Sequence, residues 1–319
     1  MTNRQVTEFQ PQIEKLIDRI GGVFLGKREL VKLSVACLLA QGHLLLEDVP
    51  GVGKTLLAQA LARSLGLKFS RIQFTSDLLP ADIVGVSVFN QTTSEFQFKP
   101  GPIFANIVLA DEINRTAPRT QSSLLEAMAE RRVSIDDQTY TLEQPFFVVA
   151  TQNPLESHGT YPLPESQLDR FLMRLSMGYP TRDVERSLLV SRRGNEPVFE
   201  IEPVLSFRDV VTLQQAVDDV RFDESLADYV LDIVAATRNT VRLAVGVSTR
   251  GALALQRASR AYAFVSGRMY VTPDDIKLLA IPVLAHRVSL GSGETVLGSS
   301  REAAASVIRE LLSKIEVPV

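Results

Sequence analysis

A glycine-rich octapeptide lying between a strand pattern and a helix pattern constrains this chain more than any other feature. It reads Asp48-Val49-Pro50-Gly51-Val52-Gly53-Lys54-Thr55, with a short apolar run at 43–47 before it and a helical pattern at 55–65 behind it. Small residues let backbone amides wrap phosphate oxygens, and a helix N-terminus adds partial positive charge. A lysine neutralises β/γ-phosphate charge, and a hydroxyl can ligate Mg²⁺. The sequence therefore predicts a bound nucleoside triphosphate.

The predicted contacts with this ligand are short and consecutive. They are Pro50, Gly51, Val52, Gly53, Lys54, Thr55 and Leu56, and Thr55 is also expected to reach the metal. One departure from the general phosphate-loop pattern stands at Asp48, where that pattern has glycine. The alternative is a turn that happens to contain Gly-Lys-Thr. The strand pattern before it and the helix pattern after it argue against that alternative.

Two carboxylates follow a second apolar run. Asp111 and Glu112 come directly after Ile107-Val108-Leu109-Ala110. Beside a phosphate loop, the first carboxylate can hold Mg²⁺ and the second can orient and deprotonate an attacking water. The alternative is structural, with Asp111 as a helix N-cap and Glu112 complementing the helix dipole. The nearby phosphate loop favours the chemical role.

A third apolar run, Phe146-Phe147-Val148-Val149-Ala150, ends in Thr151-Gln152-Asn153. Strand ends that face one edge of a parallel sheet converge on the ligand crevice. Asn153 is therefore expected to position the water or the γ-phosphate. A turn asparagine before Pro154 is the alternative.

The order of patterns along the chain predicts an α/β fold. Short apolar runs at 43–47, 69–74, 106–110, 146–151 and 171–175 alternate with helical patterns, which is typical of a parallel sheet covered on both faces. Alternating residues at 86–98 and 133–142 predict two added β-hairpins. A first helix is expected to be capped at Thr7, with Pro11 in its first turn. After 181 the patterns are helical, with a Gly/Ser-rich connector at 291–300. We therefore predict an α/β domain at 1–180 and an all-helical domain at 181–319.

Composition excludes several other classes. The chain of 319 residues has 34 basic and 37 acidic side chains, so its formal charge is −3 and argues against a protein that mainly grips nucleic acid. One cysteine, Cys37, cannot form an internal disulfide, and with three histidines it cannot form a Cys-rich zinc site. No apolar stretch reaches the length of a membrane span. We expect a soluble cytoplasmic protein that does not insert into membranes.

Five segments together resemble the AAA+ ATPases, and within them the MoxR-type ATPases. They are GVGKT, LADEINR, ATQNP, LPESQLDRF and GVSTRGALAL, and the resemblance covers about residues 9 to 290. It implies an AAA+ core with a central parallel five-stranded sheet, inserted β-hairpins and a helical lid. ATP and Mg²⁺ are the implied cofactors.

The resemblance also assigns roles to single residues. Asp111 matches the Mg²⁺-side carboxylate, Glu112 the base and Asn153 the sensor-1 residue. Arg170 matches the arginine finger that reaches a neighbour's γ-phosphate, and Arg250 matches the sensor-2 arginine of the lid. ATP is then expected between the α/β domain and the lid. For each arginine there is a plainer alternative: Arg170 could pair with Asp169 or Glu165 on the surface, and Arg250 could be an ordinary charge near a helix start.

At the level of function, the resemblance implies an ATP-hydrolysing, chaperone-like protein that matures or activates protein complexes. A homo-hexameric ring is the expected assembly, and a protein with a von Willebrand factor A domain is the expected partner. Two other functions stay open: a nucleic-acid-tracking motor, and a nucleotide-gated switch with little turnover. The acidic balance and the neutral or acidic hairpin turns argue against the motor.

Overall fold

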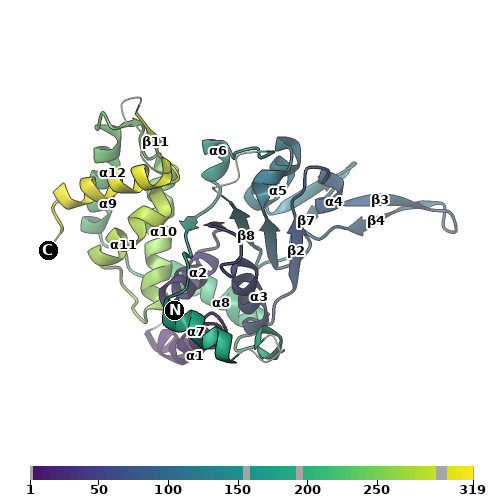
Figure 1. The fold of residues 1–319 in the computed structure, drawn as a ribbon, viewed down its shortest axis with the longest axis horizontal. Helices are drawn as coiled ribbons and strands as arrows, with labels where there is room; N and C mark the ends of the chain where they lie inside the picture. Colours follow the sequence, from purple (N-terminus) through teal and green to yellow (C-terminus); the bar gives the residue numbers. More distant parts are fainter. Residues whose placement is uncertain (1–2, 154–158, 192–196, 292–299, 319) are drawn as a thin grey trace.

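The computed structural model describes residues 3–153, 159–191, 197–291 and 300–318. Its centre is a parallel sheet of five strands in the order β2-β5-β8-β1-β9 (Figure 1). The strands are β1 (Leu44–Glu47), β2 (Phe69–Gln73), β5 (Ile107–Asp111), β8 (Phe147–Gln152) and β9 (Met173–Leu175). All five were expected from the apolar runs, and the predicted α/β class is confirmed.

The inner strands β1, β5 and β8 are largely apolar because both faces of the sheet are covered. Alternate strand residues belong to two hydrophobic clusters, one shared with α1 (Asn3–Val23), α2 (Arg28–Leu39) and α3 (Lys54–Ser64), the other with α5 (Pro118–Glu130). Every residue of β5 is buried, whereas the edge strand β2 buries only Ile72. The register pairs Glu47 with Gln152 and Gln73 with Asp111, so the carboxyl ends of four strands lie along one edge.

The first helix differs from its prediction. α1 begins at Asn3 rather than at Thr7, and Pro11 lies inside it instead of in its first turn. The capping box expected at Thr7 is therefore wrong. Besides α1, α2, α3 and α5, this part of the chain has short helical elements, which are α4 (Pro80–Val84), a 3₁₀ turn at Ile113–Arg115 and α6 (Glu165–Leu168).

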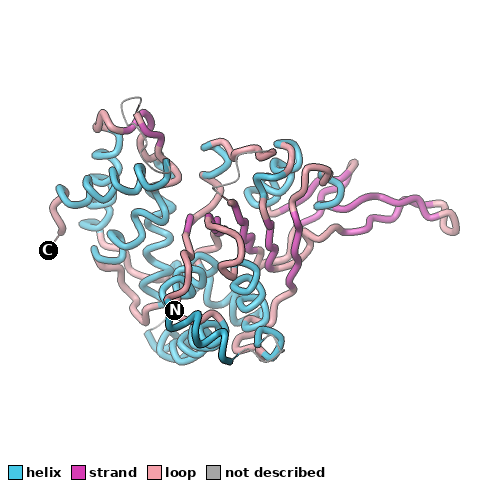
Figure 2. The backbone as a smooth tube through the Cα atoms, viewed as in Figure 1, coloured by secondary structure: helices cyan, strands magenta, loops and turns pink. Residues whose placement is uncertain are grey.

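Both predicted hairpins are present. β3 (Gly85–Asn90) pairs with β4 (Glu95–Pro100), and β6 (Arg132–Ile135) pairs with β7 (Gln138–Thr141). The first hairpin projects far beyond the body of the molecule (Figure 2). The two are joined at their bases, because the rings of Phe98 and Tyr140 stack with centroids 4.1 Å apart. The two hairpins are thus in contact, although no sequence pattern predicts that they lie side by side.

The C-terminal part is mainly helical. Its helices are α7 (Arg182–Ser191), α8 (Phe207–Asp218), α9 (Glu224–Arg238), α10 (Thr249–Val265), α11 (Pro273–Leu284) and α12 (Ser300–Lys314). A short antiparallel pair, β10 (Leu243–Val245) with β11 (Ser289–Leu290), departs from the all-helical expectation. Most of the expected connector at 291–300 lies outside the described residues. The division at residue 180 stays a prediction.

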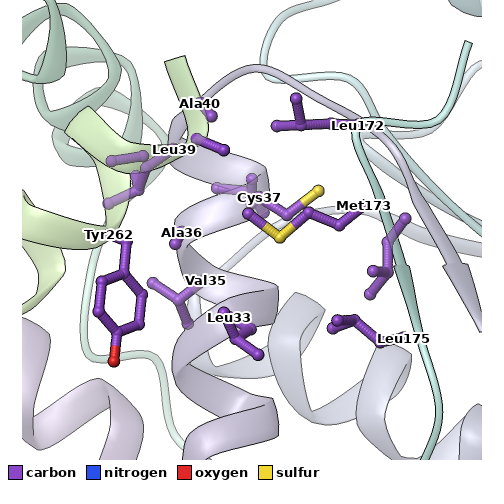
Figure 3. Packing of buried hydrophobic residues seen from close by; sticks show 14 of the residues in the cluster. Leu33, Val35, Ala36, Cys37, Leu39, Ala40, Leu172, Met173, Leu175 and Tyr262 are labelled. Atoms are coloured by element: carbon purple, nitrogen blue, oxygen red, sulfur yellow. The ribbon is translucent and has the colours of Figure 1, made fainter. Parts of the chain in front are cut away.

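Helix α2 lies between the sheet and helix α10 (Figure 3). Leu172, Met173 and Leu175 flank it on one side, and Tyr262 of α10 lies on the other. Cys37 is fully buried in this layer, and burial raises the pKa of its thiol to about 12. It is therefore a core residue, as its apolar surroundings in the sequence indicate.

Candidate nucleotide-binding site

The glycine-rich loop runs from the end of β1 to the start of α3. Gly51 has φ +83° and Gly53 φ +100°, a region that favours glycine. A Cβ on Gly53 would also lie 3.1 Å from Cε2 of Phe24, so a side chain would crowd this ring. The first intrahelical bond runs from Leu57 N to Gly53 O at 3.0 Å. The preceding N–H groups of the first turn are left to face an anion.

Asp48 is buried and anchors the base of this loop. Its Oδ2 accepts hydrogen bonds from Ser176 Oγ at 2.8 Å, Met177 N at 2.7 Å and Gly178 N at 2.6 Å, and its Oδ1 accepts one from Val49 N at 2.8 Å. Burial acts to raise the pKa of Asp48, but the four hydrogen bonds outweigh it and lower that pKa. A glycine here would leave these donors unpaired. Asp48, the residue that departs from the general pattern, thus joins the loop to residues 176–178, which follow β9.

Asp48→Asn is expected to lower the free energy of unfolding at pH 7 by about 2 kcal/mol, because the amide cannot accept all of these hydrogen bonds. The folded-state pKa is depressed, so the carboxylate's contribution is complete above its ordinary pKa of 3.8 and is lost as the pH falls below it. In urea titrations the difference from wild type should shrink as the pH falls below about 4. The exposed Asp137→Asn is the control, and a pH-independent difference would contradict this role.

The carboxylates after β5 are held by neighbouring strands. Asp111 Oδ2 accepts from Arg71 Nη2 at 2.6 Å, and its Oδ1 accepts from Thr151 Oγ1 at 2.6 Å. Glu112 Oε2 accepts from Gln73 Nε2 at 3.0 Å and from Arg115 Nη1 at 3.1 Å. Both carboxylates therefore have fixed positions, and the charge of each is balanced by an arginine.

Glu112 has an unusual backbone. Its φ of 58° lies in the left-handed region, although it is not glycine. Thr151 Oγ1 stabilises this conformation by accepting from Glu112 N at 2.8 Å. A strained conformation in a residue other than glycine costs about 1–3 kcal/mol and is often found at functional sites. Here it ends strand β5 and begins the 3₁₀ turn at Ile113–Arg115.

These groups converge on one cavity of about 490 Å³, which we call the phosphate-loop cavity. The predicted site residues that line it are Pro50, Gly51, Gly53, Lys54, Thr55, Leu56, Asp111, Glu112 and Asn153. Val52 does not line it, because its side chain is buried in the hydrophobic cluster around α1–α3. Arg71 and Gln59 also line it, and no sequence motif indicated either residue.

The donor set suits Mg²⁺ bound together with phosphate. Among the described residues, no group of three or more His, Cys, Asp or Glu side chains could hold a metal ion by itself. Mg²⁺ is usually bound through one or two carboxylates, substrate phosphates and water. Thr55 and Asp111 line the same cavity and offer hydroxyl and carboxylate oxygens. These two residues fit the ion.

Arg170 and Arg250 do not line the phosphate-loop cavity. They line a second cavity of about 720 Å³, between the C-terminal end of α5 and helix α10, which we call the arginine cavity. Arg170 Nη1 donates to Leu125 O at 2.8 Å, and Arg250 Nη1 donates to Asp169 Oδ2 at 3.1 Å. Both guanidinium groups therefore lie apart from Lys54. The phosphate-loop cavity is lined by residues of the α/β domain together with Pro197 and by no residue of helix α10. The expected position of ATP between the α/β domain and the lid stays a prediction.

Comparison with known proteins gives the family. A model of the ATPase family associated with various cellular activities (AAA) matches residues 43–173, and an AAA lid domain model matches 235–310. Chaperone MoxR1 of Mycobacterium tuberculosis is 43% identical over 87% of this chain and 76% of its own. The chain belongs to the MoxR-type AAA+ ATPases. Uncharacterized protein YeaC of Bacillus subtilis is 51% identical over 98% of this chain and 97% of its own.

A solved structure supports the same conclusion for the fold. The crystal structure of a protein from Cytophaga hutchinsonii, described as a candidate ATPase, superimposes with a TM-score of 0.89 at 37% identity. The superposition covers 99% of this chain and 98% of the Cytophaga hutchinsonii chain. The AAA+ core with a lid, predicted from the motifs, is thereby confirmed. Family membership also supports nucleotide binding by this chain.

Proposed function

We propose that this MoxR-type chain hydrolyses ATP and uses the hydrolysis to remodel other proteins. The observation that carries the proposal is the convergence of Lys54, Thr55, Asp111, Glu112 and Asn153 on one cavity at the carboxyl edge of the sheet. Ligands of open α/β sheets bind at this edge. Phosphoryl transfer needs a phosphate cradle, a metal ligand and a group that orients water, and this set provides all three.

In the proposed mechanism, the loop amides and Lys54 hold the β- and γ-phosphates. Mg²⁺, held by Thr55 and Asp111, would neutralise phosphate charge. Glu112 accepts a proton from the water that attacks the γ-phosphorus, while Asn153 fixes the position of that water or of a phosphate oxygen. The bond between the γ-phosphorus and the bridging oxygen breaks, releasing ADP and phosphate.

The site needs a second subunit. Because Arg170 and Arg250 line the arginine cavity and not the phosphate-loop cavity, both are proposed to act on the nucleotide of a neighbour. An interface in which one surface of a subunit meets a different surface of the next is heterologous. Such interfaces form a closed ring when the rotation between successive subunits brings the last one back to the first. We therefore propose a homo-oligomeric ring, with the hexamer expected from the family.

The projecting hairpins are proposed to contact the client protein. Val86, Val88, Phe89 and Phe96 of the first hairpin are exposed, and Phe96 is 75% exposed. Exposed apolar side chains gathered on one projection indicate an interaction site. The relative named a chaperone supports a protein client. The von Willebrand factor A domain partner, the maturation of complexes and the cytoplasmic location are proposed from the resemblance of the motifs to the MoxR-type ATPases. No helix within the described ranges is long and apolar enough to cross a bilayer.

Phe96→Ser is expected to reduce suppression of aggregation of a heat-denatured model protein by about ten-fold, because this ring provides the largest exposed apolar area of the hairpin. The ATP turnover without client should not change, because Phe96 lies outside both cavities that hold the proposed catalytic groups. Val241→Ser, at a position 96% exposed in the helical part, is the matched control. Equal chaperone activity of the two variants would contradict a client role for the hairpin.

Steady-state ATP hydrolysis with and without nucleic acid tests the proposed function directly. Turnover should require Mg²⁺ and should change by less than about two-fold when DNA or RNA is added at moderate salt, because the turns of the two hairpins carry no Lys or Arg that would attract phosphate. The turn of the second hairpin carries Asp136 and Asp137. Strong stimulation would support the nucleic-acid motor instead, and negligible turnover under all conditions would support the nucleotide-gated switch.

A further inference from the structure

A buried arginine lies just beyond the end of helix α11. The side chain of Arg287 is 3% exposed, although it carries a charge. Burying a charge is costly unless it is paired and hydrogen-bonded, and removing one partner of such a pair is strongly destabilising. The groups that Arg287 contacts therefore indicate which part of the molecule it organises.

Most of its contacts fall on the turn that carries Arg170. Arg287 Nε donates to Asp169 Oδ1 at 2.8 Å, Nη2 donates to Phe171 O at 2.7 Å, and Nη1 donates to Leu172 O at 3.2 Å. The neighbouring His286 places its Nε2 2.9 Å from Phe171 O. The residues on both sides of Arg170 are thus bonded to one guanidinium group.

The same turn is also bonded to helix α10. Asp169 accepts from Arg287 through Oδ1 and from Arg250 through Oδ2, the latter at 3.1 Å. One carboxylate therefore joins the ends of two lid helices to the segment between α6 and β9. Burial lowers the pKa of Arg287 to about 10 while Asp169 raises it, so the guanidinium stays charged at neutral pH.

Burial, Arg287 and Arg174 all hold the pKa of His286 well below its ordinary value, so His286 is neutral. Arg287 is therefore the buried cation of this pair. Its planar group of five donors can bind a carboxylate and several carbonyls together, which a lysine cannot do.

We propose that Arg287 is a positioning residue for the shared ATPase site. It fixes the turn that presents Arg170 to the end of lid helix α11, so that the reach of Arg170 toward the neighbour's phosphate is set by the lid. The proposal rests on the proposed function, in which Arg170 acts in a second subunit. A purely structural role would stabilise the contact between lid and core without changing the way in which subunits complement each other.

The test uses full-length Arg287→Gln and Arg287→Lys, with Arg268→Gln as matched control. Arg268 makes a two-bonded ion pair with Asp275 inside the lid, at 2.6 and 2.8 Å, and does not contact the turn at Arg170. Arg287→Gln is expected to bind ATP with unchanged affinity while turnover falls by about 100-fold, because a small displacement of a reacting group costs about that much. Arg287→Lys, which keeps the charge for assembly and folding, should lose nearly as much. Arg268→Gln should lower Tm but leave turnover within about two-fold.

Mixed assemblies separate positioning from loss of structure. Arg287→Gln subunits keep Glu112 but misplace Arg170, so mixing with Glu112→Gln subunits should restore turnover. Mixing them with Arg170→Ala subunits should not, because neither type then supplies a correctly placed finger. Arg287→Lys is mixed in the same way if Arg287→Gln does not assemble.

Turnover within about two-fold of wild type in both Arg287 variants would overturn the proposal, given the size of effect expected for displacement. Recovery with Arg170→Ala would overturn it too. The proposal would also be overturned if Glu112→Gln subunits did not restore turnover to Arg287→Gln subunits, although the mixture of Arg170→Ala and Glu112→Gln subunits did recover. The shared site would then exist, and the loss of turnover in Arg287→Gln would not come from a misplaced Arg170. If the mixture of Arg170→Ala and Glu112→Gln subunits does not recover turnover, there is no shared site. That result would contradict the proposed function as well as this inference.

Discussion

Glu112→Gln is expected to bind ATP with unchanged affinity while its turnover falls by about 10³-fold, the typical contribution of a positioned general base. The amide keeps the size of the side chain and its hydrogen bond with Gln73 or Arg115, but it cannot accept the proton of the attacking water. The residues that bind ATP in the phosphate loop are unchanged, because Lys54 and Thr55 belong to a different strand–helix connection.

The measurement is a nucleotide titration beside a steady-state assay for phosphate release. Glu143→Gln, at an exposed position of the same part of the chain, controls for the loss of one negative charge. If Glu112→Gln turned over at the wild-type rate, Glu112 would not be the base. If affinity fell as much as turnover, its role would be in holding nucleotide.

Arg170→Ala is expected to lower turnover by about 10³–10⁵-fold, the range for arginines that reach a transferring phosphoryl group. ATP affinity should change little, because Arg170 does not line the phosphate-loop cavity of its own chain. The structure supports this large effect through geometry: Arg170 is exposed and lines the arginine cavity at a face that a second subunit could cover.

Complementation distinguishes this role from a local structural one. When Arg170→Ala and Glu112→Gln subunits are mixed equally, roughly a quarter of the interfaces in a random ring pair an intact base with an intact finger. Turnover should therefore recover toward that fraction, although each variant alone is inactive. Arg186→Ala, an exposed arginine of α7, should be active without mixing. Absence of recovery at every mixing ratio, with assemblies intact, would contradict a shared site.

The parts of the fold that the sequence predicted are those with local signals. Strand β5 was recognisable because all five of its residues are buried, and the loop after β1 because glycine, lysine and threonine meet there. The hairpins were recognisable from alternation. The start of α1 was misplaced because Thr7 and Pro11 resemble an N-terminus that the chain does not use.

The missed features depend on contacts between distant parts of the chain. Three of the four hydrogen-bond donors to Asp48 lie about 130 residues later, at 176–178, and no local pattern joins them to it. Arg71 and Gln73 reach the carboxylates only because β2 pairs with β5 in a particular register. Arg250 was expected beside the nucleotide, yet its position depends on how α10 packs on α2 and on the ion pair with Asp169. Packing of this kind cannot be inferred from spacing alone.

The structure of the assembled Glu112→Gln protein with ATP and Mg²⁺ is the most direct test of the whole account. It should show the triphosphate against the N-terminus of α3, with Lys54 on its phosphates and Arg170 of the adjoining copy directed at the γ-phosphate. Nucleotide bound elsewhere, or a finger directed away from every adjoining copy, would contradict it.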